Sequence, residues 1–435
     1  STHCISSAAS DVYKRQSIAR VGNDAGFDRL INSYSYGGLF RNDMAWFQGD
    51  AVRKNPNLKP ETTISKEIGA EVRLLDGRLT ADVTYYDKYT RDQIVESELS
   101  YLSNYQRVII NSGKISNKGW EISVSGVPVK VKNFEWKTIF NWSKNNSMVE
   151  SLPEGIDKIQ IGSGVYNVKS YAEVGKPYGA IYAKTFKRDA EGYILCQLDG
   201  SPKEGQDYEY LGCVQADWRG GWNNVFRLGN FSFSVMFDFQ KGGKFFSQTS
   251  IQSSVDGQSV KSLEGRDADF FSRKILGESD EERYGFMRPQ NANTPTANGQ
   301  IYPDWGRPKG VVLPNCRYDE DVEGLAGQQV LGYCTPERYW MHYTSRDISR
   351  FIYDASYVKL REITVSYDLP KKWLRKTPFQ TFRVAAVGRN IATLFANTPH
   401  GLDPQATSTT GNAQGFERGF NLPSATYGFD IKVSF

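Results

Sequence analysis

The chain has 435 residues, enough for two to four ordinary domains or for one unusually large β-architecture. Only 39% of the residues are hydrophobic, the mean hydropathy is −0.52, and no run of about eighteen apolar residues occurs, which excludes a helical membrane protein. The 53 basic and 49 acidic residues are spread along the chain without a basic stripe, which argues against nucleic-acid binding. An aromatic content of 13% is typical of an all-β protein.

Residues 1–16, STHCISSAASDVYKRQ, match neither a signal peptide nor a β-strand, because they lack an apolar core of the required length. Their last part, DVYKRQ, is the translation of GATGTGTATAAGAGACAG, a transposon end used in preparing sequencing libraries. We therefore expect residues 1–16 to be an assembly artefact, with residues 17–435 a fragment of a longer protein. A disordered native tail is the alternative. On the first interpretation His3 and Cys4 carry no functional meaning.

From residue 64 onward the dominant pattern has a period of two, which is typical of β-strands with two different faces. The clearest example is residues 231–240, where Phe and Val alternate with Ser, Met, Asp and Gln. Strands are predicted at about 64–74, 79–85, 120–125, 134–142, 218–228, 231–240, 363–369, 382–386 and 427–435.

The connections between these strands alternate strictly between short and long. The short ones lie at residues 75–78, 127–133, 229–230 and about 370–378, and the first contains an Asp-Gly hairpin turn. The long ones lie at about 89–118, 145–217, 241–355 and 393–422. A membrane barrel has short periplasmic turns and long extracellular loops, whereas a soluble sandwich has no reason for this asymmetry. The sequence therefore predicts an all-β, antiparallel transmembrane β-barrel.

The two faces of each strand support the same prediction. Backbone groups cannot be hydrated in hydrocarbon, so a membrane-spanning sheet must close on itself. The Phe row of residues 231–239 would then contact lipid, and the polar row would line a wet lumen. The rings expected at the membrane interfaces are Trp120, Trp136, Trp142, Trp218 and Trp222. The alternative is that these aromatic residues form the core of a soluble β-sandwich.

The three His and five Cys show no spacing suited to a zinc site, and no cofactor is expected. Cys196 and Cys213 bracket one hydrophilic stretch, and Cys316 and Cys334 bracket another. Either pair would close a loop in an oxidising compartment, but unpaired thiols remain equally open.

Residues 55–61 read NPNLKPE and precede a Glu-containing strand. This string resembles the N-P-x-L-K-P-E motif of TonB-dependent outer-membrane receptors, and the chain as a whole resembles the C-terminal barrel part of a SusC/RagA-type receptor of Bacteroidetes. Strings at 114–122, 175–182, 218–224, 238–243, 354–361 and 387–390 agree with that family in the same order. The motif residues are Asn55, Pro56, Leu58, Lys59, Pro60 and Glu61.

Residues 17–24 resemble the end of a barrel strand of that family whose first half is missing. Counting this stub, about ten strands are present here, whereas the resemblance implies a barrel of twenty-two strands, with the plug, TonB box and first strands upstream. The last strand resembles the signal that barrel-insertion machinery recognises. Its residues are Tyr427, Phe429, Ile431, Val433 and Phe435. A fragment with open edges in hydrocarbon would neither insert nor transport alone, so any function belongs to the parent protein.

The function implied by the resemblance is uptake of oligosaccharides or peptides across the outer membrane, beneath a SusD-like lipoprotein and driven by TonB acting on the missing N-terminal part. A siderophore-type TonB-dependent receptor is one alternative, and a soluble secreted β-protein is another. No acid pair or nucleophile constellation is evident, so we expect no enzyme and no catalytic or metal-binding residue. Asp199, Glu204, His342 and His400 are interpreted as solvated loop residues.

Substrate contacts, if this part makes any, would come from exposed aromatic rings of the longest loop, because such rings stack on sugars. The alternative is that these rings fold the loop or contact the SusD-like partner. The candidates are Tyr302, Trp305, Tyr339, Trp340 and Tyr343. Lumen charges are expected to hold the plug: Glu67, Glu71, Arg73, Asp82 and Arg383.

Overall fold

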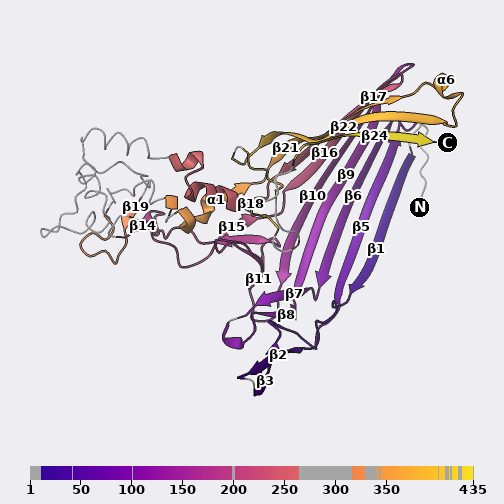
Figure 1. Cartoon of the computed structure of the whole chain (residues 1–435). Coiled ribbons are helices and arrows are strands. Elements are labelled where there is room, and N and C mark those ends of the chain that lie inside the picture. Colours follow the sequence, from indigo (N-terminus) through magenta and orange to yellow (C-terminus); the bar gives the residue numbers. More distant parts are fainter. Residues whose placement is uncertain are drawn as a thin grey trace, which may run out of the picture.

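The computed structural model describes residues 11–41, 43–99, 101–197, 201–263, 316–328, 340–341, 344–399, 401–406, 411, 414–419 and 424–434. Its main feature is a ten-stranded antiparallel sheet whose strands follow one another in chain order (Figure 1). The strands are β1 (Asp11–Asn23), β5 (Glu61–Leu74), β6 (Leu79–Arg91), β9 (Lys114–Val131), β10 (Phe134–Ser151), β16 (Trp218–Leu228), β17 (Phe231–Lys241), β21 (Tyr357–Asp368), β22 (Thr381–Ala396) and β24 (Thr426–Ser434). The predictions of an antiparallel all-β fold and of about ten strands are confirmed.

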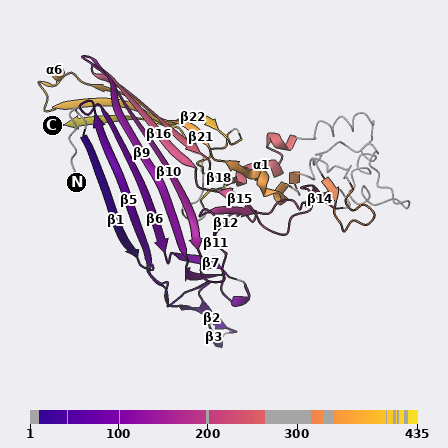
Figure 2. The same ribbon diagram turned by 180° about the vertical axis from the view of Figure 1, so that it is seen from behind.

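Short and long connections alternate as the sequence predicts. The turn between β5 and β6 contains three residues of positive φ, Leu75, Asp76 and Gly77, and the turn between β16 and β17 contains Gly229 with φ 58°. The short connection between β21 and β22 carries the helix α6 (Lys371–Leu374). Figures 1 and 2 show α6, the start of β1 and the end of β24 at one end of the sheet, and the long connections at the other.

Several predicted boundaries are wrong. Strands β9 and β10 each span 18 residues and run well into the segments predicted as loops. At about 3.4 Å per residue they are longer than the ~25 Å apolar band requires, so their loop-side ends can carry polar residues while their backbones stay paired. Residues 11–16, predicted not to form a strand, are the first part of β1 and pair with β5 from Asp11 opposite Arg73. The edge of β5 has unpaired backbone N–H and C=O groups, and an extended segment can pair with them whatever side chains that segment carries.

The long connections carry small structures of their own. Counted from β1, there are five of them in the described sheet, at residues 24–60, 92–113, 152–217, 242–356 and 397–425. The first contains the hairpin β2 (Tyr34–Phe40) and β3 (Met44–Gly49), followed by β4 (Val52–Arg53). The second contains β7 (Ile94–Glu98) and β8 (Arg107–Asn111), and β8 pairs with both β4 and β7. The third holds β11 (Lys158–Ser163), β12 (Lys169–Glu173), β13 (Ala180–Ala183), β14 (Ile194–Cys196) and β15 (Glu209–Cys213). The fourth and last contribute β18 (Lys244–Ser247), α1 (Gln248–Val255), β19 (Cys316–Tyr318), β20 (Ile352–Asp354) and β23 (Phe416–Glu417).

In the described part of the chain, the hydrophobic cores lie in these connections and at the loop-side ends of β9 and β10, where Ile115 and Val149 join one of them. One core packs Phe246 and Ile251 against residues of three other segments, namely Val168, Ile181, Ala183, Ile348, Phe351 and Phe416. Large apolar side chains of the sheet are instead exposed, with Phe231 at 57%, Phe429 at 86% and Ile431 at 63%. A soluble sandwich would cover such a face with a second sheet, whereas lipid covers it in a membrane barrel.

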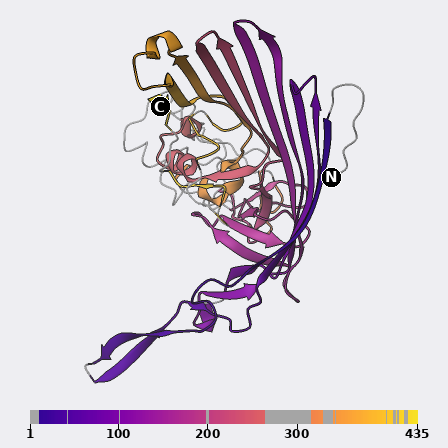
Figure 3. The ribbon, with the colours of Figure 1, turned by 90° about the vertical axis from the view of Figure 1, so that its right-hand side faces the viewer.

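The sheet is curved, and the elements of the later long connections lie on its concave side, whereas the β2–β3 hairpin projects beyond the end of the sheet (Figure 3). Strands β1 and β24 form its two edges in the described part of the chain. Among the described residues, no helix is both long and apolar enough to cross a membrane.

Candidate functional site: the polar concave face and its outer loops

The strand register sorts the side chains into two faces, because residues directly opposite each other point to the same side of a sheet. One row across β6, β9, β10, β16 and β17 consists of Asp82, Ser123, Asn141, Gly221 and Asp238. The adjacent row, on the other face, consists of Val83, Ile122, Trp142, Gly220 and Phe239. The sheet therefore has one polar and one apolar face, as the alternation predicts.

The polar face is the concave one. It holds a hollow of about 400 Å³ whose lining comes from six strands, from Arg15 on β1 to Asp238 on β17. Four of the five charges predicted for the lumen lie on this face in ion pairs: Asp82 with Arg15 at 2.5 Å, Glu71 with Arg73 at 2.7 Å, and Arg383 with Asp368 at 2.6 Å. The fifth, Glu67, accepts a hydrogen bond from the Ser65 hydroxyl at 3.1 Å. Their expected contact with a plug stays a prediction.

A second polar hollow, also about 400 Å³, lies where the last long connection meets the sheet. Lys359 of β21, 5% exposed, donates to both carboxylate oxygens of Asp403 at 2.5 and 2.6 Å and to the Gln405 amide oxygen at 2.9 Å. Arg361 donates to Asp238 and, at 2.7 Å, to the same Gln405 oxygen. These contacts fix residues 403–405 over the concave face. The sequence analysis did not single them out, because they join segments about forty residues apart without a local pattern.

Two indole N–H groups on the apolar face have hydrogen-bond acceptors. The Trp136 indole N–H donates to Asn224 at 3.1 Å, and the Trp222 indole N–H donates to Thr138 at 2.9 Å. Trp136 lies near the short turn after β9, and Trp120 lies toward the loop end beside Tyr85, at 5.0 Å between ring centroids. Trp222 sits between these levels, opposite Phe140 and Phe237. Trp120 and Trp136 therefore lie at the two levels expected for the membrane interfaces, whereas Trp222 lies between these levels.

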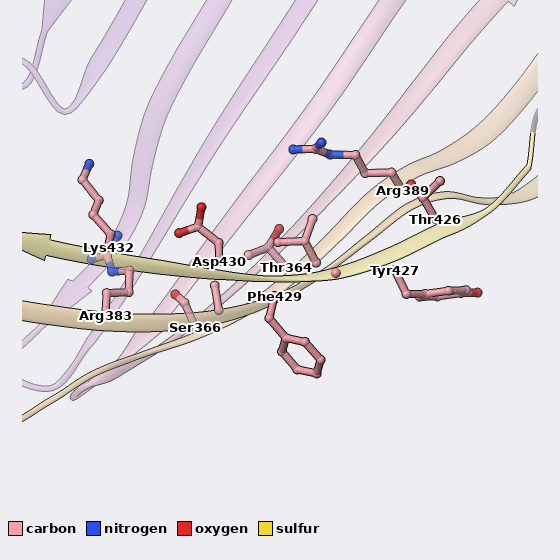
Figure 4. A pocket seen from close by; sticks show the side chains of 12 residues that line it. Thr364, Ser366, Arg383, Arg389, Thr426, Tyr427, Phe429, Asp430 and Lys432 are labelled. Carbon is pink, nitrogen blue, oxygen red and sulfur yellow. The ribbon is translucent and has the colours of Figure 1, made fainter.

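The last strand shows the two faces at close range. Tyr427 and Phe429 project to one side of β24, and Asp430 and Lys432 project to the other, with Lys432 beside Arg383 (Figure 4). Ile431 and Val433 are opposite Val384 and Phe382 of β22, on the side of Phe429. Phe435 lies outside the described residues. Recognition of this strand by insertion machinery remains a prediction.

The NPNLKPE segment forms a turn that leads into β5. The Asn55 side chain accepts from the Asn57 N–H at 3.0 Å, and the Lys59 N–H donates to the Asn111 side chain at 2.9 Å. Glu61, the first residue of β5, accepts from the Ile94 N–H at 2.7 Å and from Asn23 at 3.1 Å. These hydrogen bonds link the connection that precedes β5 to the connection that follows β6. The segment therefore has a structural role.

Of the five predicted loop aromatics, only Trp340 lies within the described residues, and Tyr302, Trp305, Tyr339 and Tyr343 lie outside them. Trp340 is 1% exposed, with the Arg350 guanidinium 5.5 Å from its ring centroid. For this residue the burial favours the alternative stated above, that the ring folds the loop.

A buried carboxylate, Asp319, connects the third and fourth long connections. Its side chain accepts from Lys187 at 2.8 Å and from Lys203 at 2.7 Å, and its carboxylate is 4% exposed. Burial alone would raise the pKa of Asp319, but the hydrogen bonds from Lys187, Lys203 and the Glu320 N–H outweigh it and lower the pKa to about 2. The group therefore stays ionised in neutral and mildly acidic medium.

We expect the loop contact made by Asp319 to be lost in strong acid. Because its folded pKa lies below the unfolded value of about 3.9, its contribution is complete above about pH 4 and disappears as the pH falls toward 2. Hydrogen exchange, corrected for intrinsic rates, should show residues 194–197 and 201–203 losing protection over that window. Asp319→Asn should already lack this protection at pH 7, and the control Asp430→Asn should retain it. Full protection of Asp319→Asn at pH 7 would contradict the assignment.

Comparison with known proteins finds a family model and several relatives to which the chain is similar. The family model "TonB dependent receptor-like, beta-barrel" matches residues 17–189. TonB-dependent receptor P3 of Formosa agariphila is 25% identical over 395 residues, which cover 86% of this chain and 33% of that protein. TonB-dependent receptor SusC of Bacteroides thetaiotaomicron is 29% identical over 104 residues, 24% of this chain and 10% of that protein.

A solved structure, that of the RagAB peptide transporter, shares the fold with a TM-score of 0.63 at 17% identity, covering 98% of this chain and 41% of that chain. The chain thus spans about a third of the length of the P3 receptor that it matches. The family consists of receptors and transporters of the outer membrane. The family-model match shows that residues 17–189 are similar to the TonB-dependent receptor β-barrels of the outer membrane, and together with these relatives and the two-faced antiparallel sheet the chain fits a SusC/RagA-like receptor fragment.

Proposed function

We propose that the chain supplies C-terminal barrel strands to a TonB-dependent transporter that imports oligosaccharides or peptides. The observation that carries this proposal is the polar concave face, which is lined across six strands and partly covered by loops at the outer end. Such a surface can pass a hydrated ligand while the opposite face contacts lipid. The RagAB neighbour, described as a peptide transporter, supports the ligand class.

The proposal requires further parts of the parent protein. The edges β1 and β24 would leave unpaired backbone groups in hydrocarbon, so additional strands are needed for closure. A plug would bind the paired charges of the lumen, and TonB would act on that plug. A SusD-like lipoprotein would cover the outer loops. The transporter needs no catalytic residue, because the ligand is moved without covalent chemistry.

Deletion of the parent gene in its host tests the proposal. We expect loss of uptake of one class of labelled oligosaccharide or peptide, and we expect a protonophore to abolish the same uptake in the wild type, because TonB is energised by the proton gradient. Growth on the corresponding monosaccharide or amino acid should be unaffected. A defect confined to iron-limited medium would contradict this proposal in favour of siderophore uptake, and recovery of the parent protein as a water-soluble secreted form would contradict both.

A further inference from the structure

The short parallel pair β14 and β19 joins two loops that are far apart in the sequence. In its register Ile194 lies opposite Cys316, and Cys196 lies opposite Tyr318. Residues 194, 196, 316 and 318 therefore share one face of the pair, because side chains alternate along a strand. Cys196 is fully buried and Cys316 is 5% exposed. The two cysteines are thus neighbours on one buried face.

The Cys196 side chain lies close enough to the Cys316 thiol to lower its pKa by hydrogen bonding. Cys213 is differently placed: it lies in β15, and its sulfur contacts the Tyr178 carbonyl at 3.5 Å and the Gln215 N–H at 3.4 Å. The sequence left open a bond between Cys196 and Cys213, but the fold brings Cys196 to Cys316 instead. Cys334 lies outside the described residues.

Charged contacts hold the two strands together on either side of the cysteines. The Asp319 N–H donates to the Cys196 carbonyl at 3.0 Å, and the Asp319 carboxylate binds Lys187 and Lys203. The Arg317 guanidinium lies 3.6 Å from the Tyr193 ring centroid and forms an ion pair with Glu191 at 2.8 Å. The backbone around both sulfurs is therefore fixed before any covalent bond forms.

We propose that Cys196 and Cys316 form a disulfide bond in the exported protein, joining the third long connection to the fourth outside the membrane. The outer membrane is reached through an oxidising compartment, where such bonds persist. Formation needs an oxidant, which is the disulfide of a periplasmic thiol–disulfide oxidoreductase.

The exchange proceeds in two balanced steps. One cysteine thiolate attacks the disulfide of the oxidoreductase, forming a mixed disulfide and releasing one of its thiolates. The second cysteine loses its proton and attacks the mixed disulfide, forming the Cys196–Cys316 bond. The oxidoreductase leaves as a dithiol, having gained the two electrons and two protons that the cysteines lost. The hydrogen bond from Cys196 and the charge of Arg188 lower the pKa of the Cys316 thiol against the opposing effect of burial, which favours the thiolate.

The sequence allows an unambiguous test, because trypsin separates every cysteine. Cleavage after Arg188, Lys203, Lys309 and Arg317 places Cys196 in peptide 189–203, Cys213 in 204–219, Cys316 in 310–317 and Cys334 in 318–338. The receptor is purified from outer membranes without reductant, denatured with N-ethylmaleimide, digested and analysed by mass spectrometry. We expect peptides 189–203 and 310–317 to be covalently linked. A link from 189–203 to 204–219, a link from 310–317 to 318–338, or two alkylated thiols would overturn the proposal.

A second measurement addresses the effect of the bond on the folded loops. Dithiothreitol should speed limited proteolysis after Lys203 several-fold in the wild-type receptor and in the control Cys213→Ser, because reduction lets the loops separate. The double variant Cys196→Ser/Cys316→Ser should be cut quickly with or without reductant. A wild-type rate that does not respond to dithiothreitol would show that the bond does not hold these loops.

Discussion

Replacing Phe237 with arginine is expected to prevent stable assembly of the receptor in the outer membrane, whereas the same replacement of its neighbour Met236 is expected to be tolerated. Both residues are apolar, so their hydrophobicity does not distinguish them. Phe237 lies on the apolar face opposite Trp222, with ring centroids 5.8 Å apart. Met236 lies on the polar face opposite Glu362, which pairs with Arg389.

The expected loss of stability in Phe237→Arg depends on how deep position 237 lies in the membrane. Phe237 lies about 20 Å along β17 from the short turn, which for a strand tilted by about 40° is close to the bilayer midplane. Arginine facing lipid at that depth costs about 2–4 kcal/mol, a large fraction of the stability of a folded chain. At position 236 the new guanidinium would be near a carboxylate and water. The folded fraction in outer-membrane preparations, read as the heat-modifiable band in gel electrophoresis, measures both variants, with Phe237→Leu as the size control. Equal losses at the two positions would contradict the assignment of faces.

Removing the carboxylate of Asp403 is expected to detach the last long connection from the sheet. Lys359 is almost fully buried and has Asp403 as its carboxylate partner, with Gln405 as a neutral acceptor. Breaking a buried ion pair from one side leaves an uncompensated charge and costs about 3 kcal/mol or more. Asp403→Ala should therefore strongly increase hydrogen exchange in residues 401–406 and lower the thermal midpoint of the purified receptor.

The double variant Lys359→Met/Asp403→Ala distinguishes this cause from simple loss of a contact. With both charges removed, no buried charge remains unpaired, so the double variant should be more stable than Asp403→Ala alone. The matched control is Asp430→Ala, which removes a carboxylate from an exposed position of the polar face and should have little effect. A double variant less stable than the single one would contradict the proposed role of the buried lysine.

The strand pattern could be predicted because each strand has two chemically different faces. The alternation in residues 231–240 identifies β17 and its lipid-facing Phe row, and the Asp76-Gly77 turn fixes the first hairpin. Strand ends were less predictable, because β9 and β10 continue beyond the apolar band, where polar residues such as Asn145 and Ser147 no longer signal a loop. The strand formed by residues 11–16 was missed because its partner, the edge of β5, lies about fifty residues away.

The loop contacts could not be predicted from sequence for a different reason. The pairs β14–β19 and β18–β23 are parallel and join segments more than a hundred residues apart. Neither pair has a turn or a periodic pattern that would reveal it. The same holds for Asp319 with Lys187 and for Cys196 with Cys316. Such contacts follow from the way the sheet places the long connections together at one end.

The central claim is that the apolar face of the sheet contacts lipid and the polar face lines the lumen. Photocrosslinking tests it most directly: benzoylphenylalanine is placed at each position from 233 to 238 of the full-length receptor in outer membranes, and lipid adducts are detected by mass. The account predicts adducts at positions 233, 235 and 237 and none at 234, 236 and 238. Adducts at the second set, or at neither set, would contradict it.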